Sequence, residues 1–142
     1  MATVSLLTKA TQKAADELAA LGSALHADSR TLTTDELGKL LSNENLALVV
    51  VEDDGRIVGM GSLYVIPKIG KQNAYIEDVI VDESYRGQGL GEKLVRELID
   101  IAKQRGVKSV TLTSRSHRAA AHKLYVKLGF NTVDTNVFKL SL

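Results

Sequence analysis

The chain has 142 residues, 44% of them hydrophobic, and a formal net charge of +1 at pH 7. This length and composition predict one domain, residues 1–142, with a core of ordinary size. The small net charge and the 4% aromatic content argue against a nucleic-acid partner, which requires a basic surface. The chain contains no cysteine, which excludes disulfides, a thiolate nucleophile and cysteine zinc sites.

Targeting and metal signals are also missing from the sequence. The amino terminus has no basic segment followed by a long apolar stretch, and no apolar run reaches membrane-spanning length. We therefore expect a cytoplasmic protein without a membrane partner. His117 and His122 lack a histidine four residues away and an acidic cluster, so no metal is expected.

The first half of the chain predicts a short strand, two helices and a hairpin. Residues 4–7 form a short apolar run, and apolar residues then recur every three or four positions over 9–26, as in a helix. His26 ends this helix and fits a partner of the helix dipole better than a catalyst. Thr33 and Glu36 form a capping-box pattern for a second helix that ends near Ser42. Residues 46–52 and 57–66 predict strands joined by a turn at 53–56.

The second half predicts alternating strands and helices. Residues 67–73 predict a loop, 74–82 a strand, and the apolar stripe that starts at Leu90 a long helix capped by Gly106. A strand at 107–113 follows, and the helix between the two strands predicts that they are parallel. A last helix at 118–128 is closed by Gly129. Residues 130–134 and 137–140 predict a terminal pair of strands.

Three glycines at alternate positions separate the strand at 74–82 from the long helix, in the segment YRGQGLGE at 85–92. Glycine tolerates positive φ and a close ligand, so the amides of 87–92 can converge on one anion. The free N–H groups and the dipole of the next helix point to the same place. Glu92 replaces the third glycine of a Rossmann fingerprint, and the Walker pattern also fails. The simpler alternative is a glycine-rich turn that only caps the helix.

The remaining pattern, Arg86-x-x-Gly89-x-Gly91 after the segment EDVIVD at 77–82, resembles motif A of the GNAT superfamily of acyl-CoA-dependent N-acetyltransferases. A second segment resembles the family's motif B, with matches at Ala121, Tyr125, Gly129 and Phe130. Arg118 stands where that motif has asparagine, so the asparagine contact to pantetheine has no counterpart here.

The order of elements also resembles this family over nearly the whole chain. It implies an α/β (α+β) GNAT fold with four helices and a mixed, mostly antiparallel, twisted sheet of about six to seven strands. The two central parallel strands are expected to splay apart in a V.

The resemblance implies transfer of an acetyl group from acetyl-CoA to a primary amine by direct attack in a ternary complex. The chain has no cysteine that could form an acetyl-cysteine intermediate, which agrees with direct transfer. The strand backbone would pair with the pantetheine arm, and the Val79 N–H would donate to the thioester oxygen. Solvated charge is the simpler interpretation of Arg115 and Arg118, and a 3′-phosphate contact is the alternative. The implied cofactor-binding residues are Val79, Ile80, Val81, Arg86, Gly87, Gln88, Gly89, Leu90, Gly91, Glu92 and Arg118.

Three residues are candidates for proton transfer. Tyr125 is the candidate acid for the departing thiolate, and Glu77 is the candidate base, on the same strand face as Val79. Asp78 competes with Glu77, and the run Glu77-Asp78-Val79 resembles that of glucosamine-6-phosphate N-acetyltransferases. A bulge in the strand would decide which carboxylate faces the cleft.

Two other functions remain open at this point: a non-catalytic acyl-CoA sensor or interaction module on the same fold, and a different nucleotide-binding domain. The acceptor is expected to be a small-molecule or peptide amine. Lys68 and Lys71 could attract an acidic one. The chain is expected to be a monomer, or a homodimer formed through its terminal strands.

Overall fold

The computed structural model describes residues 1–115 and 118–142. His117, one of the two histidines considered for a metal, lies outside the described residues. Within them, a five-stranded sheet with the order β1-β2-β3-β4-β5 forms the middle layer. Consecutive strands from β1 to β4 are antiparallel to one another, and β5 runs parallel to β4. The strands are β1 (Thr3–Leu6), β2 (Leu46–Asp53), β3 (Arg56–Lys68), β4 (Lys71–Val81) and β5 (Ser109–Leu112).

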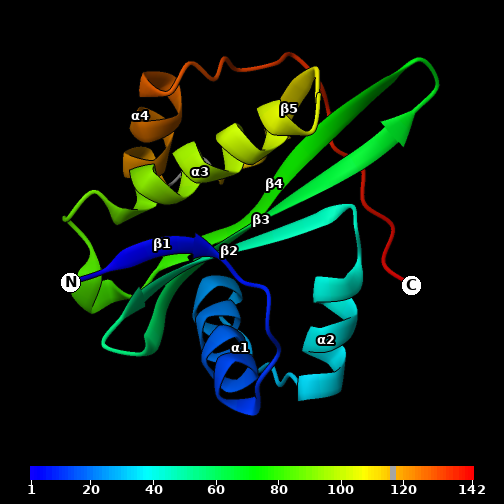
Figure 1. The fold of residues 1–142 in the computed structure, drawn as a ribbon. Helices are drawn as coiled ribbons and strands as arrows, with labels where there is room; N and C mark the ends of the chain where they lie inside the picture. Colours follow the sequence, from blue (N-terminus) through cyan, green and yellow to red (C-terminus); the bar gives the residue numbers. More distant parts are fainter. Residues whose placement is uncertain (116–117) are drawn as a thin grey trace.

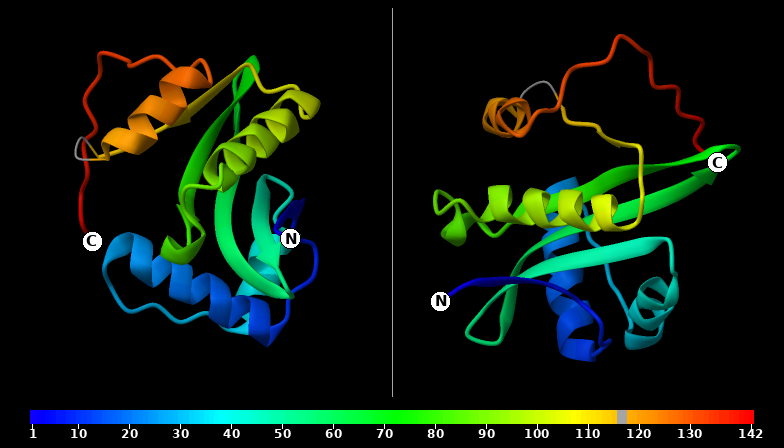
Figure 2. Two further views of the ribbon diagram at one scale, coloured as in Figure 1. Left: turned by 90° about the vertical axis from the view of Figure 1, so that its left-hand side faces the viewer. Right: turned by 45° about the horizontal axis from the view of Figure 1, so that its top comes forward.

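Two helices cover each face of the sheet (Figures 1 and 2). On one face lie α1 (Gln12–His26) and α2 (Thr34–Ser42), and on the other α3 (Leu90–Gln104) and α4 (Ala119–Lys127). The mixed sheet and the four helices confirm the expected fold class. As its continuous apolar sequence indicates, β2 is buried on both faces: Val50 packs toward α1, and Val49 and Val51 pack toward α3.

Side-chain caps fix the starts of the two amino-terminal helices. The Thr11 hydroxyl accepts a hydrogen bond from Ala14 N at 3.1 Å, which starts α1 three residues later than the apolar periodicity predicts. The capping box of α2 is confirmed: Glu36 N donates to Thr33 Oγ1 at 3.1 Å, and Thr33 N donates to Glu36 Oε1 at 3.0 Å.

The predicted loop over 67–73 is wrong. The β3–β4 ladder extends to the pair Lys68 and Lys71, so the connection is the two-residue turn of Ile69 and Gly70, in which Gly70 has a φ of 81°. The polar residues near the tip resemble a loop in composition, but they occupy a hairpin that projects from the body of the molecule (Figure 1).

The predicted terminal strands are also absent. Residues 130–142 contain no strand, so the described sheet has five strands and not six to seven. Phe138 and Leu140 are 91% and 82% exposed. The alternation of apolar and polar residues predicts a strand there, but a strand also needs a partner, and in the described chain this segment pairs with neither edge strand of the sheet.

The two parallel strands separate as expected. They pair only between residues 73–76 of β4 and 109–112 of β5. β4 then continues to Val81, whereas β5 ends at Leu112. On the β5 side, the backbone of residues 77–81 therefore faces a gap between the strands, which opens toward the glycine segment.

Candidate active site

The glycine segment lies between the short 3-10 helix η1 (Glu83–Tyr85) and α3. Gly87 and Gly89 have φ values of 80° and 77°, the left-handed conformation that their sequence pattern predicts. A Cβ atom at either position would meet no atom within 4 Å. Backbone conformation, and not packing, therefore explains glycine at both positions, and the space beside them is open to a ligand.

The amino terminus of α3 has no side-chain cap. Its N-cap is Gly89, and no side chain accepts a hydrogen bond from the first turn. The first N–H groups of a helix have no partner within the helix, so they are available to an anion. At Gly91, by contrast, a Cβ atom would make an ordinary contact with Leu124 in α4, at 3.9 Å.

The other residues predicted in this segment have different surroundings. Gln88 is exposed, and Leu90 is buried in the core under α3. The Glu92 side chain pairs with Lys127 at 2.6 Å and with Arg96 at 3.0 Å, and these two cations lower its pKa. Only the backbone amide of Glu92 therefore remains a candidate for binding an anion.

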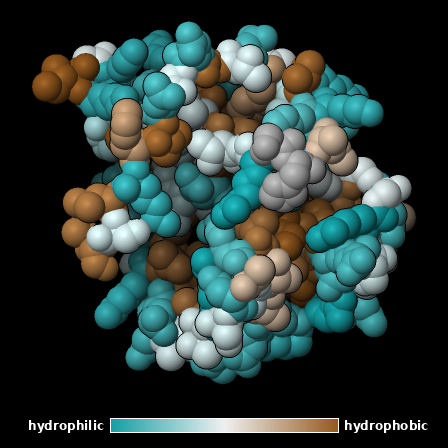
Figure 3. All heavy atoms as spheres, turned by 180° about the vertical axis from the view of Figure 1, so that it is seen from behind, coloured by the Kyte–Doolittle hydropathy of each residue, from teal (hydrophilic) through white to brown (hydrophobic). Residues whose placement is uncertain are grey.

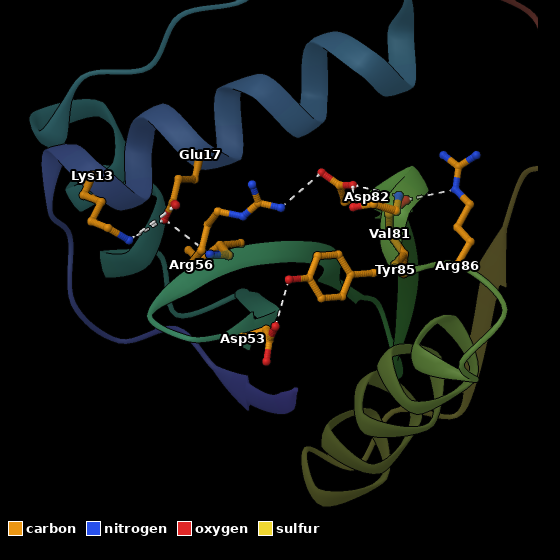
Figure 4. Close-up of polar contacts among 10 residues, drawn as sticks. Lys13, Glu17, Asp53, Arg56, Val81, Asp82, Tyr85 and Arg86 are labelled. Atoms are coloured by element: carbon orange, nitrogen blue, oxygen red, sulfur yellow. Dashed lines mark hydrogen bonds and ion pairs between the residues drawn. The ribbon is translucent and has the colours of Figure 1, made fainter. Parts of the chain in front are cut away.

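A polar network holds the glycine segment against the β2–β3 turn (Figure 4). The Tyr85 hydroxyl donates to Asp53 at 2.8 Å, and the Arg56 guanidinium lies 5.8 Å from the Tyr85 ring centre. Arg56 also pairs with Asp82 at 3.6 Å. Arg86 donates through Nε to the Val81 carbonyl at 3.0 Å, so its side chain turns back onto the end of β4.

The same network reaches α1. Glu17 accepts from the Ile57 amide at 3.3 Å and pairs with Lys13, which also donates to the Gly55 carbonyl. Sequence reasoning missed the network because residues in contact, such as Asp53 and Tyr85, lie 32 positions apart and belong to no common motif.

β4 contains the bulge on which the choice of carboxylate depends. Met60 pairs with Ile80 and Ser62 with Glu77, so Asp78 and Val79 lie together opposite Gly61. Asp78 has a φ of 55°, which is uncommon for a residue other than glycine. Gly61 is closely packed, because a Cβ atom there would lie 3.0 Å from the Leu98 side chain and 3.4 Å from that of Val79.

The bulge corrects the predicted faces of this strand. Val79 packs on the α3 side, together with Val81, whereas Ile80 is buried on the α1 side. Glu77 is paired with Ser62, which lines a cavity on the α1 side. Glu77 and Val79 therefore lie on opposite faces, and the prediction of a common face is wrong, because the extra residue reverses the alternation.

The cavity lies between the sheet and the helices α1 and α2, and has a volume of about 250 Å³. Its walls are largely apolar, from residues such as Leu18, Leu37 and Met60. The polar lining includes the side chains of Asp78, Tyr64, Ser62 and Arg30.

Asp78 has a partner that sequence reasoning missed. His26 Nε2 lies 2.9 Å from Asp78 Oδ1. The helix-dipole interpretation accounts for the position of His26 in the last turn of α1 but not for this contact. Desolvation raises the pKa of Glu77, and the Asp78 charge adds to the effect while His26 opposes it. Burial and the same two carboxylates raise the pKa of Tyr64.

Tyr125 lies on α4, on the opposite side of the sheet. It is half-buried against the cluster that includes Val79 and Val81, and its ring packs edge-on against Phe130 with centres 5.8 Å apart. Burial raises the pKa of the phenol, and the nearby Arg118 charge opposes that shift. Arg118 is the N-cap residue of α4 and donates its N–H to the Arg115 carbonyl at 3.0 Å.

Acetyl-CoA is the ligand to test against this geometry. The open space at Gly87 and Gly89, the uncapped start of α3 and the gap beside β4 provide anion and backbone contacts of the kind it needs. Among the described residues, the buried hydroxyl of Ser114, just beyond β5, has no hydrogen-bond partner. The rear face also shows a hollow with exposed apolar atoms amid hydrophilic ones (Figure 3). The residues present therefore fit this group.

Two findings limit other interpretations. In the part of the chain that the structure describes, no helix is both long and apolar enough to cross a membrane. Across the same residues, no three histidine, cysteine, aspartate or glutamate side chains gather as a metal site would require.

Comparison with known proteins identifies the family. The model of the acetyltransferase (GNAT) family matches residues 6–130. The chain is 44% identical over 79 residues to a glucosamine 6-phosphate N-acetyltransferase of Trypanosoma brucei brucei, which covers 54% of this chain and 52% of that protein. It is 38% identical over 82 residues to the ribosomal protein bS18-alanine N-acetyltransferase of Escherichia coli K12, which covers 56% and 55%.

The chain thus spans about half the length of the curated relatives it matches. A crystal structure of a Trypanosoma brucei acetyltransferase matches over 100% of both chains, with a TM-score of 0.83 and 29% identity. Sequence, fold and the glycine segment agree, and the chain belongs to the acetyltransferase (GNAT) family.

Proposed function

We propose that the chain is an N-acetyltransferase, formed by residues 1–142 as one domain, that transfers an acetyl group from acetyl-CoA to a primary amine. The observation that carries this proposal is the pair Gly87 and Gly89, left-handed and facing open space at the uncapped start of α3. This arrangement suits a pyrophosphate bound through backbone amides. The family and its named acetyltransferases support the same reaction.

The edge and the α1-side face of β4 would supply different parts of the reaction. Along the edge of β4 that faces β5, the unpaired backbone of residues 77–81 would bind the pantetheine arm, and the Val79 N–H would donate to the thioester oxygen. Bound acetyl-CoA supplies the activated acetyl group as a thioester. On the α1 side, the cavity beside Asp78 would hold the amine.

Proton transfer would involve three side chains. The amine nitrogen loses two protons in all. The second, lost after the C–N bond forms and the C–S bond breaks, would pass to solvent and replace the proton that the leaving thiolate takes. The first, lost by the ammonium before the attack, goes to a carboxylate. We assign that proton to Glu77, whose raised pKa brings it closer to the pKa of an amine, and assign to Asp78 the binding of the ammonium. Tyr125 gives its phenolic proton to the leaving thiolate; its raised pKa keeps the phenol protonated at neutral pH.

A thiol-release assay tests this function. The protein is incubated with acetyl-CoA and a panel of primary amines, and free CoA is measured against samples that lack an amine. We expect thiol release that depends on the amine. Binding of CoA with no such release for any amine would contradict catalysis and leave a non-catalytic acyl-CoA-binding module.

A further inference from the structure

The charges around the α1-side cavity are predominantly negative. Asp78 lines the cavity, and Glu77 lies next to it on the same face of the sheet. Ser62, the strand partner of Glu77, lines the cavity together with Tyr64, so both carboxylates lie at the cavity wall or beside it, and burial and their charges raise the pKa of Tyr64. His26 contacts Asp78 and carries a positive charge only when it is protonated.

Arg30 is the only cationic residue among the described lining residues, and it is already paired. Its Nε lies 3.0 and 3.1 Å from the two carboxylate oxygens of Asp28. Its aliphatic chain packs over α1, with Cδ at 3.5 Å from where a Cβ atom at Gly22 would lie. Arg30 is thus the single cationic residue of the described lining, against the carboxylates of Asp28, Asp78 and Glu77 in and beside the cavity.

The two lysines of the β3–β4 hairpin, Lys68 and Lys71, are too distant to change this balance. Lys68 and Lys71 lie at the exposed tip of the β3–β4 hairpin, four residues along β3 from Tyr64. At the rise of a strand, this separation is roughly 13 Å. That distance exceeds the physiological screening length of about 8 Å, so these lysines do not offset the carboxylates. The suggestion that they attract an acidic acceptor is therefore not supported by their position.

We infer that this cavity selects an unphosphorylated primary amine, bound as its ammonium ion beside Asp78 and carried on an apolar or uncharged body. This inference rests on the proposed function and specifies its acceptor. An ammonium is attracted by the surrounding carboxylates, whereas a phosphate dianion is repelled by them and meets a guanidinium that is already paired. The apolar walls contributed by residues such as Leu18, Leu37 and Met60 provide contact for the rest of the acceptor.

A matched pair of acceptors tests the inference. Glucosamine and glucosamine 6-phosphate carry the same amine and differ in the phosphate. We expect glucosamine to bind the CoA complex at least about tenfold more tightly in calorimetric titration. The difference should shrink as salt is added, because screening weakens the repulsion. A second series, from ethylamine to hexylamine, should bind more tightly as the chain lengthens.

A variant tests the role of charge directly. Asp28→Asn removes one carboxylate and frees Arg30, so the preference for glucosamine over its phosphate should fall severalfold. Asp100→Asn is the matched control: it makes the same charge change at an exposed position on α3, across the sheet from the cavity, and should leave the preference unchanged.

The outcomes separate the two proposals. Equal or tighter binding of glucosamine 6-phosphate would overturn the inference about the acceptor, and if its acetylation releases thiol the proposed function stands. Binding in the expected order without thiol release from any amine would support the charge selection and contradict the proposed catalysis. Equal effects of Asp28→Asn and Asp100→Asn would also overturn the inference, because they would show that net charge acts without regard to position.

Discussion

At the scale of single residues, Tyr125 is the simplest to test. Its phenol is half-buried on α4, and burial raises its pKa, so it carries a proton at neutral pH. Tyr125→Phe removes only the hydroxyl and retains the edge-on contact with Phe130. If Tyr125 is the acid, kcat should fall roughly 10²-fold or more, while the affinity for CoA changes little. A variant with normal kcat would exclude this role.

The pair Glu77 and Asp78 predicts a change in pH dependence. The Asp78 charge contributes to the raised pKa of Glu77, so Asp78→Asn should lower that pKa. A base works only when deprotonated, so the acid limb of the kcat/KM profile should move to lower pH in Asp78→Asn, even though ammonium binding weakens.

Glu77→Gln is the companion measurement, because it should remove the same limb altogether. If the limb stays in place in Asp78→Asn and persists in Glu77→Gln, then Glu77 is not the base, and Asp78 or water takes the proton.

The properties of single residues were predictable from the sequence where a local motif determines them. Positive φ at Gly87 and Gly89 follows from the glycine spacing and is confirmed. The sequence raised a bulge in β4 only as an open question, because a bulge depends on which residues of β3 lie opposite. One of these is Gly61, and its close packing becomes visible only when α3 packs over it. The His26–Asp78 contact joins residues 52 positions apart, so no local pattern predicts it.

At the scale of elements, glycine has different effects in two places. In the glycine segment it permits a left-handed backbone, whereas within α2 it lowers the helix propensity. Gly89→Ala places a side chain at a φ of 77° in open space, so its cost is backbone strain alone, about 1–2 kcal/mol of unfolding free energy. The amides that face the anion should also shift, which weakens CoA binding.

Gly38→Ala is the control for this variant. It lies within α2, where a Cβ atom would make an ordinary 3.9 Å contact with Ala10, so the change should stabilise the protein by about 0.5–1 kcal/mol. Denaturant unfolding and CoA titration of both variants check the prediction. Equal CoA affinity in Gly89→Ala and wild type would show that this conformation is not needed for binding.

Elements with strong local signals were predictable, and those that depend on distant partners were not. The capping box gave the start of α2, and the turn at 53–56 gave the β2–β3 hairpin. The β3–β4 hairpin extends through residues that look like a loop, because a ladder continues while its partner remains in register. The prediction of terminal strands was wrong for the opposite reason: residues 130–142 have an alternating pattern, but they pair with no strand of the described sheet.

For the whole molecule, the account places the two substrates on either side of one strand. The cavity next to Asp78 faces α1 and α2, whereas Val79 and Val81 lie on the α3 side, where Tyr125 of α4 also packs. Side chains alternate between the two faces along β4, as in any strand, and the bulge changes which residues face each side, so that Glu77 and Val79 lie on opposite faces. The polar network around Tyr85 ties the glycine segment to the β2–β3 turn and through Glu17 to α1, so both sides share one support.

The central claim is that the glycine segment binds the pyrophosphate of CoA. The most direct test is the thermal midpoint of the protein alone and with acetyl-CoA, CoA, ATP or NADH. A ligand at ~100 times its dissociation constant adds roughly 2.7 kcal/mol, a shift of several degrees for a chain of this size. The account predicts that acetyl-CoA and CoA raise the midpoint and that ATP and NADH do not. No shift with either CoA species would contradict it and reduce the glycine segment to a helix cap.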